Sequence, residues 1–430
     1  MRLAQVIWLI ATIVFGPAVV ASGQTLVAPT PAVEVSPPPE QTRAAQIVPL
    51  TYEAALQRAM AVNPTIVAAR LRRSISVASR RVAAERLNPE VRAELARETP
   101  KEGYTVALPW ELGGKRARRI AVSDAAIATS EAELNQTIAQ VQSEVRHAYI
   151  ARFLAENRQM LLDEVQGLAA RARDAAQARF EAGDAPRLEV VQAQLALADV
   201  QNQAEGARGL VAGGRAALNA LLGYPLDAPT PIVTTIDVGP ALAVDAALAR
   251  ARRGNAELMT FDRRLAEQRA RVRLAQALRT PDLTTEGTLT RRAEPEFDTG
   301  WRAGVAMILP VFTTHRAAVR VEEATLAQLT GEREAALARI SGEVVSAAAI
   351  ADAQRQQYLR YRDNIIPQAA EVERMAEDSY RLGQTGIAAY LQALQSARDV
   401  RLRAIQSAAD LQNALADLER AVGTPVTTVP

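Results

Sequence analysis

An internal duplication constrains the fold of this chain more than any other feature of its sequence. Segments of the first half recur at an offset of about 200 residues, which is the signature of a repeated structural unit. The matching segments are Ala54–Leu56 and Ala246–Leu248, Phe180–Gly183 and Tyr380–Gly383, and Leu222–Gly223 and Val422–Gly423. Each copy carries two short amphipathic strand candidates followed by an unusually long helical stretch. This organisation predicts two similar halves that share one architecture, and it suggests a tube.

Composition favours helices packed closely in pairs and excludes several functions. Aromatic residues are only 4% of the 430 residues while alanine is frequent, so we expect thin cores of Ala, Leu and Val. A formal charge of +2 from 50 basic and 48 acidic residues gives no indication of nucleic-acid binding. The absence of cysteine excludes disulfides, thiol chemistry and a lipid anchor on an N-terminal cysteine.

The N-terminus predicts export from the cytoplasm. A basic residue at position 2, an apolar run from Val6 to Val20 and small residues after it indicate a signal peptide over residues 1–23. Residues 24–48 are rich in proline, and we expect them to form a disordered leader. No later stretch is long and apolar enough for a spanning helix, so the mature chain is expected to be soluble or inserted as strands.

The first structural repeat is expected over residues 49–228. It begins with a helical pattern from Thr51 to Leu87, with a kink or break at Pro64. A β-hairpin is predicted at residues 90–112, because apolar and polar side chains alternate in both of its strands. The apolar positions are Val91, Ala93 and Leu95 in one strand and Tyr104, Val106, Leu108 and Trp110 in the other.

The second structural repeat is expected over residues 240–423, followed by a C-terminal tail at 424–430. Its hairpin is predicted at residues 282–311, with strands of about nine to eleven residues, the length a tilted strand needs to cross a bilayer. One face would hold Leu283, Thr285, Gly287 and Leu289, then Trp301, Ala303, Val305, Met307 and Leu309. Tyr104, Trp110 and Trp301 lie near strand ends, as in membrane aromatic belts. The alternative is a pair of hairpins in a soluble sheet.

Long helices follow both hairpins. Ile120, Ile127, Leu134 and Val141 recur every seventh residue, which predicts a coiled-coil seam. Proline is absent between Gly114 and Ala182, and only Pro367 occurs in the equivalent stretch of the second copy. Each long helix is expected to turn at a glycine-containing corner and to be followed by a returning helix. Four strands cannot close a membrane barrel, so three or more chains must pool their strands, and a trimer supplies twelve.

Several segments, taken in order, resemble the outer-membrane factor (TolC) family from about Leu50 to Gly423. They are Leu50–Leu56 with Asn63-Pro64, Leu108-Pro109, Leu309–Phe312 and the two glycine corners, while Glu111–Arg116 with Arg119 is similar to the CzcC-like, heavy-metal efflux branch. The resemblance implies a mainly α fold, with a long antiparallel coiled-coil α-barrel and four strands per chain in a trimeric twelve-stranded outer-membrane β-barrel. It implies a passive efflux duct in a Gram-negative outer membrane, with its helical tunnel in the periplasm.

The same resemblance implies partners and sites. A homotrimer would dock on a periplasmic adaptor protein and an inner-membrane efflux pump, with the RND type as a candidate. The helical corners would dock the adaptor, and the alternative is that they are only turns. These tip residues are Gly183, Asp184, Pro186, Arg187, Gly383, Gln384, Thr385 and Gly386.

In TolC, the member that gives the family its name, acidic residues just after the second corner close the periplasmic mouth, but the aligned positions here are Ala389 and Gln392. Glu189 of the first copy could form a ring of three, or it could be a solvated helix residue. Lys115 and Arg116 are expected either to reach lipid headgroups or to be ordinary charges at a helix start.

No residue set indicates an enzyme, a cofactor or a metal site. A periplasmic coiled-coil adaptor or scaffold is the alternative function, as is a drug or type I protein-secretion duct of the same fold.

Overall fold

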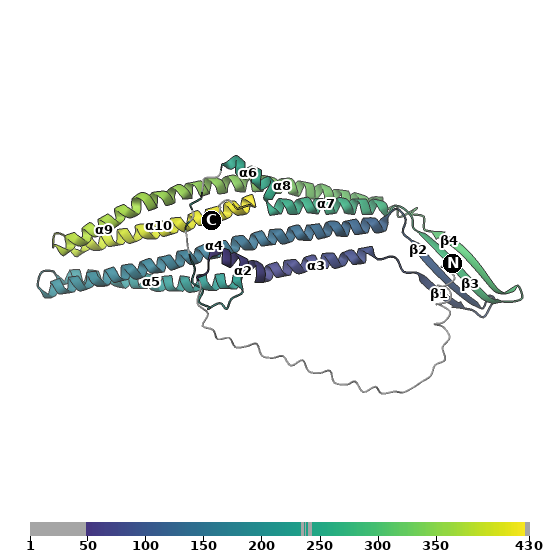
Figure 1. Ribbon diagram of the computed structural model, residues 1–430, viewed down its shortest axis with the longest axis horizontal. Coiled ribbons are helices and arrows are strands. Elements are labelled where there is room, and N and C mark those ends of the chain that lie inside the picture. The colour runs from purple at the N-terminus through teal and green to yellow at the C-terminus, as the bar shows by residue number, and fades with distance from the viewer. Residues whose placement is uncertain (1–48, 234–235, 237, 240–242, 426–430) are drawn as a thin grey trace, which may run out of the picture. The chain divides into compact units, whose positions relative to one another are not determined.

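The computed structural model describes residues 49–233, 236, 238, 239 and 243–425, which belong to one unit of the chain beginning at Ile47 (Figure 1). The first repeat forms α2 (Tyr52–Val62), α3 (Pro64–Ala84), β1 (Glu90–Leu95), β2 (Glu102–Trp110), α4 (Lys115–Glu181) and α5 (Arg187–Leu222). The second forms α6 (Val244–Gly254), α7 (Ala256–Ala277), β3 (Leu283–Ala293), β4 (Phe297–Met307), α8 (Arg316–Arg360), a π-helix (Tyr361–Ile365), α9 (Ile366–Arg381) and α10 (Ile387–Val422). The predicted signal peptide (1–23), the leader (24–48) and residues 426–430 of the predicted tail lie outside the described residues.

Asparagine caps divide the first helical segment of each repeat at equivalent places. The Asn63 side chain accepts a hydrogen bond from the Thr65 N–H at 2.9 Å, and Asn255 accepts one from the Glu257 N–H at 3.0 Å. Pro64 is the first residue of α3, where the missing N–H breaks no helical hydrogen bond. The predicted break at Pro64 is therefore confirmed, and its physical origin is a cap followed by a new helix.

The long helix of the first repeat runs without interruption. α4 has 67 residues, so it extends about 100 Å at 1.5 Å per residue. The predicted seam is confirmed near its middle, where Val141 and Val145 are buried and Leu134 and Ile138 pack against the same cluster. Buried alanines at the contacts between helices, among them Ala172, Ala176 and Ala193, allow close packing. The cores are thin, as the composition indicates.

The long helix of the second repeat changes its winding near Pro367. α8 passes into a five-residue π-helix, Tyr361–Ile365, and α9 begins at Ile366 with Pro367 in its first turn. Because proline lacks an N–H and crowds the carbonyl four residues before it, a wider turn here relieves the conflict. The helix therefore continues through the proline position instead of ending there.

The four strands form one antiparallel sheet in the order β1-β2-β3-β4. The two hairpins are joined through β2 and β3, while β1 and β4 are the edges and pair with no further strand of the described chain. The helices follow the same order, because α3 contacts α4, α4 contacts α7 and α7 contacts α8. Figure 1 shows the strands at one end of the helices and the α4–α5 and α9–α10 turns at the other.

Strand bounds differ slightly from the sequence expectation. β1 ends at Leu95, and directly after it the Ala96 N–H donates to the Lys101 carbonyl at 2.9 Å and closes the turn to β2. β4 ends at Met307, two residues before the predicted Leu309, since no neighbouring strand extends the ladder at this edge of the described chain. The two hairpins nevertheless have the predicted order and alternation.

Candidate functional site

The strand register gathers the apolar side chains of both repeats on one face of the sheet. Across the sheet from β1 or β2 to β4, its apolar rows are Ala93–Tyr104–Leu289–Trp301, Val91–Val106–Gly287–Ala303, Leu108–Thr285–Val305 and Trp110–Leu283–Met307. The row next to the hairpin turns, Leu95–Glu102–Arg291–Thr299, is mixed and carries two charges. Trp301 is 82% exposed and Val305 is 69% exposed in the described chain. An apolar face of this size on a two-faced sheet is typical of strands that contact lipid.

The opposite face of the sheet is polar and charged. Its rows are Glu90–Ala107–Glu286–Gly304, Arg92–Thr105–Thr288–Arg302 and Glu94–Gly103–Thr290–Gly300. The Thr105 and Thr288 hydroxyls lie 3.0 Å apart, and the Arg92 guanidinium lies 2.8 Å from the Glu90 carboxylate. Such a face favours contact with water, so the sheet fits a boundary between lipid and an aqueous space.

The predicted interface aromatics lie at two levels of the apolar face. Tyr104 and Trp301 belong to the row near the hairpin turns, whereas Trp110 lies at the end nearest the helices. The Trp110 indole N–H donates to the Thr285 hydroxyl at 3.0 Å. Two separated aromatic levels match the two interfaces of a bilayer, although contact of these rings with lipid stays a prediction.

The joint between β2 and α4 is fastened to the second repeat. The Lys115 ammonium lies 2.7 Å from the Asp282 carboxylate, and the same carboxylate accepts the Leu112 N–H at 3.1 Å. Lys115 is only 6% exposed. Gly113 has a φ of +70°, and a Cβ added there would lie 2.7 Å from the Thr280 hydroxyl, so this position requires glycine for two reasons. We call Lys115, Asp282, Leu112 and Gly113 the closed joint.

The arginines after Lys115 cap the end of a neighbouring helix. Arg116 donates to the Ala84 carbonyl at 2.8 Å, and Arg119 donates to the Glu85 carbonyl at 3.1 Å and pairs with Glu111. Basic residues at a helix start oppose its dipole, but here they lie beside the C-terminus of α3, where positive charge is favourable. These contacts provide hydrogen-bond partners for the last carbonyls of α3, which ends at Ala84, three residues before the predicted Leu87.

Lys115 and Arg116 therefore do not lie as the headgroup hypothesis expects. Lys115 is buried against Asp282, and the Arg116 guanidinium is directed to a backbone carbonyl. The sequence could not indicate this arrangement, because the partners lie in segments that are distant along the chain. Within the described residues, these two side chains join the sheet to the helices.

The two helical corners have the same backbone structure. At the first, Gly183 N–H donates to the Phe180 carbonyl at 3.0 Å and Asp184 N–H to the Arg179 carbonyl at 2.8 Å. At the second, the equivalent donors are Gly383 (3.0 Å, to Tyr380) and Gln384 (2.9 Å, to Ser379). This is the Schellman pattern, and φ values of +82° and +68° explain the two glycines.

The remaining tip residues begin the returning helices. Pro186 is the N-cap of α5 and Arg187 its first residue, while Gly386 is the N-cap of α10 and Thr385 precedes it. The tip residues are exposed, and a Cβ at Gly183 or Gly383 would meet no atom within 4 Å. Both helical turns therefore occur where the sequence predicts them and are exposed, while their contact with a partner stays a prediction.

A polar and aromatic cluster joins the helical hairpin α4–α5 to the helical hairpin α9–α10, close to the tips. The Arg179 guanidinium lies 5.1 Å from the centre of the Tyr380 ring and 3.8 Å from the Glu189 carboxylate. The Tyr380 and Tyr390 rings stack with centres 5.5 Å apart. Burial raises the pKa of the Tyr380 phenol above its ordinary value. The sequence indicated Glu189 but not Arg179 or the two tyrosines, although Tyr380 lies three residues before Gly383 and Tyr390 lies four residues after Gly386.

The other two positions considered for the mouth lie outside this cluster. Ala389 and Gln392 are exposed, on a part of α10 where Tyr390 and Leu391 are the buried neighbours. Glu189 has only 16% of its side chain exposed. The three residues therefore do not form one group: the single carboxylate is held by an arginine, and the other two positions carry no charge.

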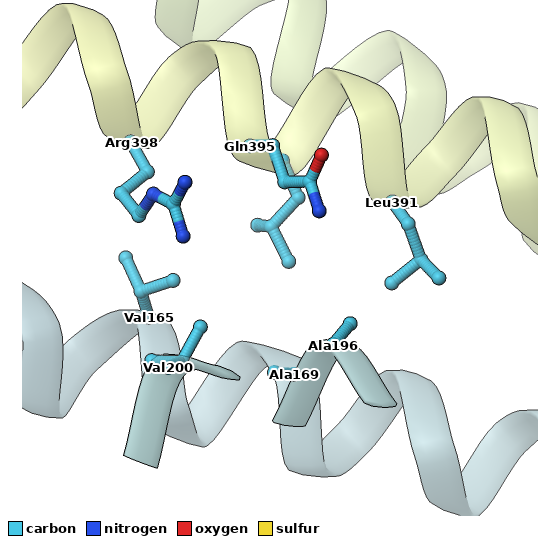
Figure 2. Close-up of a pocket in the computed structure, with 8 residues that line it drawn as sticks. Val165, Ala169, Ala196, Val200, Leu391, Gln395 and Arg398 are labelled. Atoms are coloured by element: carbon cyan, nitrogen blue, oxygen red, sulfur yellow. The ribbon is translucent and has the colours of Figure 1, made fainter. Parts of the chain in front are cut away.

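The space between the α4–α5 helical hairpin and α10 is too small for a ligand. A cavity of about 10 Å³ lies between α4, α5 and α10, at the lower limit for one water molecule. Figure 2 shows Val165 and Ala169 facing Leu391, Gln395 and Arg398 across it. Arg398 also lies 3.5 Å from Asp199, so ion pairing continues at its edge. This seam is closely packed and is not a binding pocket.

No helix in the described part of the chain has the length and apolar character needed to cross a membrane. Among the same residues, no three acidic, histidine or cysteine side chains gather as metal ligands would. His147 lies between Asn413 (2.9 Å) and Asp417 (3.2 Å), where it connects α4 to α10.

Comparison with known proteins gives a consistent relationship for both repeats. Residues 55–224 and 247–424 match the family described as "Outer membrane efflux protein". The cobalt-zinc-cadmium resistance protein CzcC of Cupriavidus metallidurans is 26% identical over 269 residues, covering 61% of this chain and 64% of that protein. The nickel-cobalt-cadmium resistance protein NccC of Alcaligenes xylosoxydans xylosoxydans is 28% identical over 290 residues, covering 62% of each. The chain thus spans less than two thirds of the length of these curated relatives.

The fold is also found among solved structures. The crystal structure of CusC, described in connection with transmembrane channel formation, has a TM-score of 0.73 at 16% identity. The match covers 88% of this chain and 93% of that one. At this identity the likeness concerns the fold, and it includes both the helices and the sheet.

Proposed function

Because the chain belongs to the outer membrane efflux protein family, we propose that it is the outer-membrane channel of a tripartite efflux system. The observation that carries this proposal is the sheet, which has one apolar face, one charged face and two unpaired edges. Open edges are not tolerated in lipid, so the sheet has to be closed by other strands. Three copies supply twelve strands, enough for a closed barrel around an aqueous lumen.

In this proposal the helices continue the lumen into the periplasm as a tunnel. Transport is passive and has no catalytic step. The partners are two further copies of the chain, a periplasmic adaptor, an inner-membrane pump, of which the RND type is the candidate, and outer-membrane lipid. Fractionation of the cell envelope tests it: a heat-modifiable trimer in the outer membrane supports the duct, and a soluble periplasmic protein refutes it.

The cargo class rests on the relatives. CzcC and NccC are named for resistance to cobalt and cadmium, with zinc in one case and nickel in the other. We propose divalent heavy-metal cations as cargo, with selectivity residing in the pump, since a passive duct requires no tight metal site. A strain lacking the chain should lose resistance to these cations. Loss of drug resistance or of protein secretion instead would favour the alternative ducts of the same fold.

The two tips are proposed to recruit the adaptor. Replacing Gly183 or Gly383 by Val forces a β-branched residue into a positive-φ position, at a cost of about 1–2 kcal/mol, while the space around each tip is open. We expect trimer levels in the membrane to stay unchanged and metal resistance to fall. Crosslinking to the adaptor from Cys introduced at Asp184 or Gln384 should be lost in these variants.

Gly331→Val serves as the matched control for the tips, because Gly331 lies within α8 with no atom near its added Cβ and has no positive φ. It should leave both resistance and crosslinking intact. If both survive in the Gly183 and Gly383 variants as well, the tips are only turns and docking lies elsewhere.

The periplasmic mouth is proposed to lack a cation-binding carboxylate ring. Ala389 and Gln392 carry no charge, and the Glu189 carboxylate is already held near Arg179. Divalent cations should therefore block single channels in planar bilayers only weakly from the periplasmic side. Glu189→Gln should leave that weak block unchanged, and strong block abolished by this substitution would show a first-repeat gate.

A further inference from the structure

In the described part of the chain a strand passes into a long helix at two places, and only at one of them does the first helical residue form an ion pair. The first is the closed joint, where buried Lys115 pairs with Asp282 at 2.7 Å. It connects the β2–α4 passage to the α7–β3 passage, so it lies at the contact between the two repeats. The second is the β4–α8 passage, at the edge of the described unit.

The duplication relates these two places residue by residue. It aligns Val91 with Leu283 and Val106 with Met307, and each hairpin pairs its own two members: Val91 with Val106, and Leu283 with Met307. The same alignment makes Glu90 the counterpart of Asp282 and Arg316 the counterpart of Lys115. The backbone agrees at the helix starts, since Gly114 and His315 both have positive φ, +71° and +54°.

The second joint is open where the first is closed. Arg316 is exposed and forms no ion pair with any described residue. The run before it is strongly apolar and uncovered, with Ile308 at 85%, Leu309 at 65% and Phe312 at 100% exposure. Four such side chains in sequence, with Val311 among them, are unfavourable in water and indicate a surface that a partner covers.

The complementary half of this joint lies at the opposite edge of the same chain. Glu90 begins β1, and α3, which precedes it, has no contact with α8. Glu90 pairs with Arg92 at 2.8 Å, but both side chains are more than half exposed, so that pair is weak and does not occupy the carboxylate. Leu87, on the α3–β1 passage, is 50% exposed. The β4 edge thus offers a positive charge and the β1 edge a negative one, and both edges expose apolar side chains.

We propose that the open joint closes on a second copy of the chain, with Arg316 paired to Glu90 of the partner subunit as Lys115 is paired to Asp282 within one chain. The run Ile308–Phe312 then covers the α3–β1 passage of the partner subunit. The contact is head-to-tail, because the two edges differ, and repeated use of it closes a ring. This inference rests on the proposed trimeric duct and assigns the residues that join its subunits.

Crosslinking tests the pairing directly, because the chain contains no cysteine. A variant carrying Arg316→Cys and Glu90→Cys, treated in membranes with a short bifunctional thiol reagent, should yield covalent dimers and trimers on denaturing gels. The pair Lys115→Cys and Asp282→Cys should crosslink only within a monomer. Arg316→Cys with Glu286→Cys is the matched negative control, since Glu286 shares the sheet row of Glu90 but lies in β3, away from the edge.

Charge exchange gives an independent readout. Arg316→Glu and Glu90→Arg should each weaken every subunit contact about tenfold, the factor expected for losing roughly 1.4 kcal/mol of interaction. Because a trimer contains three such contacts, the amount of heat-stable trimer should fall by at least this factor. The double variant should recover most of it, whereas Arg118→Glu, an exposed arginine in the first turn of α4, should have no effect.

The outcomes separate the two proposals. Covalent trimers and rescue by charge exchange support the proposed contact between Arg316 and Glu90 of the partner subunit. If noncovalent trimers form but crosslinking and rescue both fail, the proposed Arg316–Glu90 contact is wrong, while the proposed trimeric channel is still supported. If the unaltered chain forms no trimer in membranes, the proposed function itself is overturned.

Discussion

Val106→Arg is expected to remove most of the trimer from the outer membrane. Val106 lies in a middle row of the apolar face, with Val91, Gly287 and Ala303, so the arginine would be held at mid-bilayer depth. A charge there costs about 2–4 kcal/mol, and three copies carry it in each trimer. Quantifying heat-modifiable trimer in outer-membrane fractions measures the effect.

Met307→Arg should be less severe, because Met307 shares its row with Trp110 at the end of the sheet near the helices, where the cost of a charge falls. Ala107→Arg is the matched control: it is the next residue after Val106, on the polar face, between Glu90 and Glu286. Its trimer level should stay close to that of the unaltered chain. Equal loss for Val106→Arg and Ala107→Arg would contradict the assignment of the two faces.

Gly423→Ala is expected to destabilise the protein by about 3 kcal/mol or more, one of the larger effects available to a single methyl group. Gly423 ends α10 with a φ of +77°, and an added Cβ would lie 2.3 Å from the Gly254 carbonyl oxygen and 2.6 Å from its carbon. These are backbone atoms at the division between α6 and α7, so no side-chain rotation relieves the clash. The midpoint of thermal unfolding of the purified trimer measures it.

Two other glycines provide a graded comparison. Gly223 is the counterpart in the first repeat, and a Cβ there would lie 3.2 Å from a Val62 methyl group, which can move. Gly383 has a φ of +68° and open space, so Gly383→Ala should cost only about 1 kcal/mol. The order of destabilisation should be 423, then 223, then 383. Another order would mean that the positive-φ strain, and not the distance from the added Cβ to its neighbouring atoms, determines the loss of stability.

Local patterns allowed much of the fold to be predicted from the sequence. Alternation identified both hairpins, and proline located the break at Pro64, whereas the asparagine cap before it became evident only in the structure. The duplication allowed each element to be compared with a second example. The strand ends were less accurate, because the end of β4 depends on whether a neighbouring strand continues the ladder and not on its own residues.

Contacts between distant segments could not be predicted in the same way. The closed joint pairs Lys115 with Asp282, and the polar and aromatic cluster near the tips brings Arg179 to Tyr380. Neither partner is within reach along the chain, and a basic helix start is compatible with lipid, solvent or a neighbouring helix end. One signal was present, since four basic residues at a helix N-terminus oppose the helix dipole and therefore require a partner.

The closed joint and its open counterpart imply different dependences on protein concentration. Lys115 and Asp282 belong to one chain, so damage to that pair changes a unimolecular equilibrium and should be the same at any expression level. A substitution at Arg316 changes the association equilibrium between subunits, and a higher protein concentration compensates for it. In a duplicated chain of this kind, one of the two equivalent joints forms during folding and only the other forms by subunit association. A low protein concentration therefore limits only the joints between subunits.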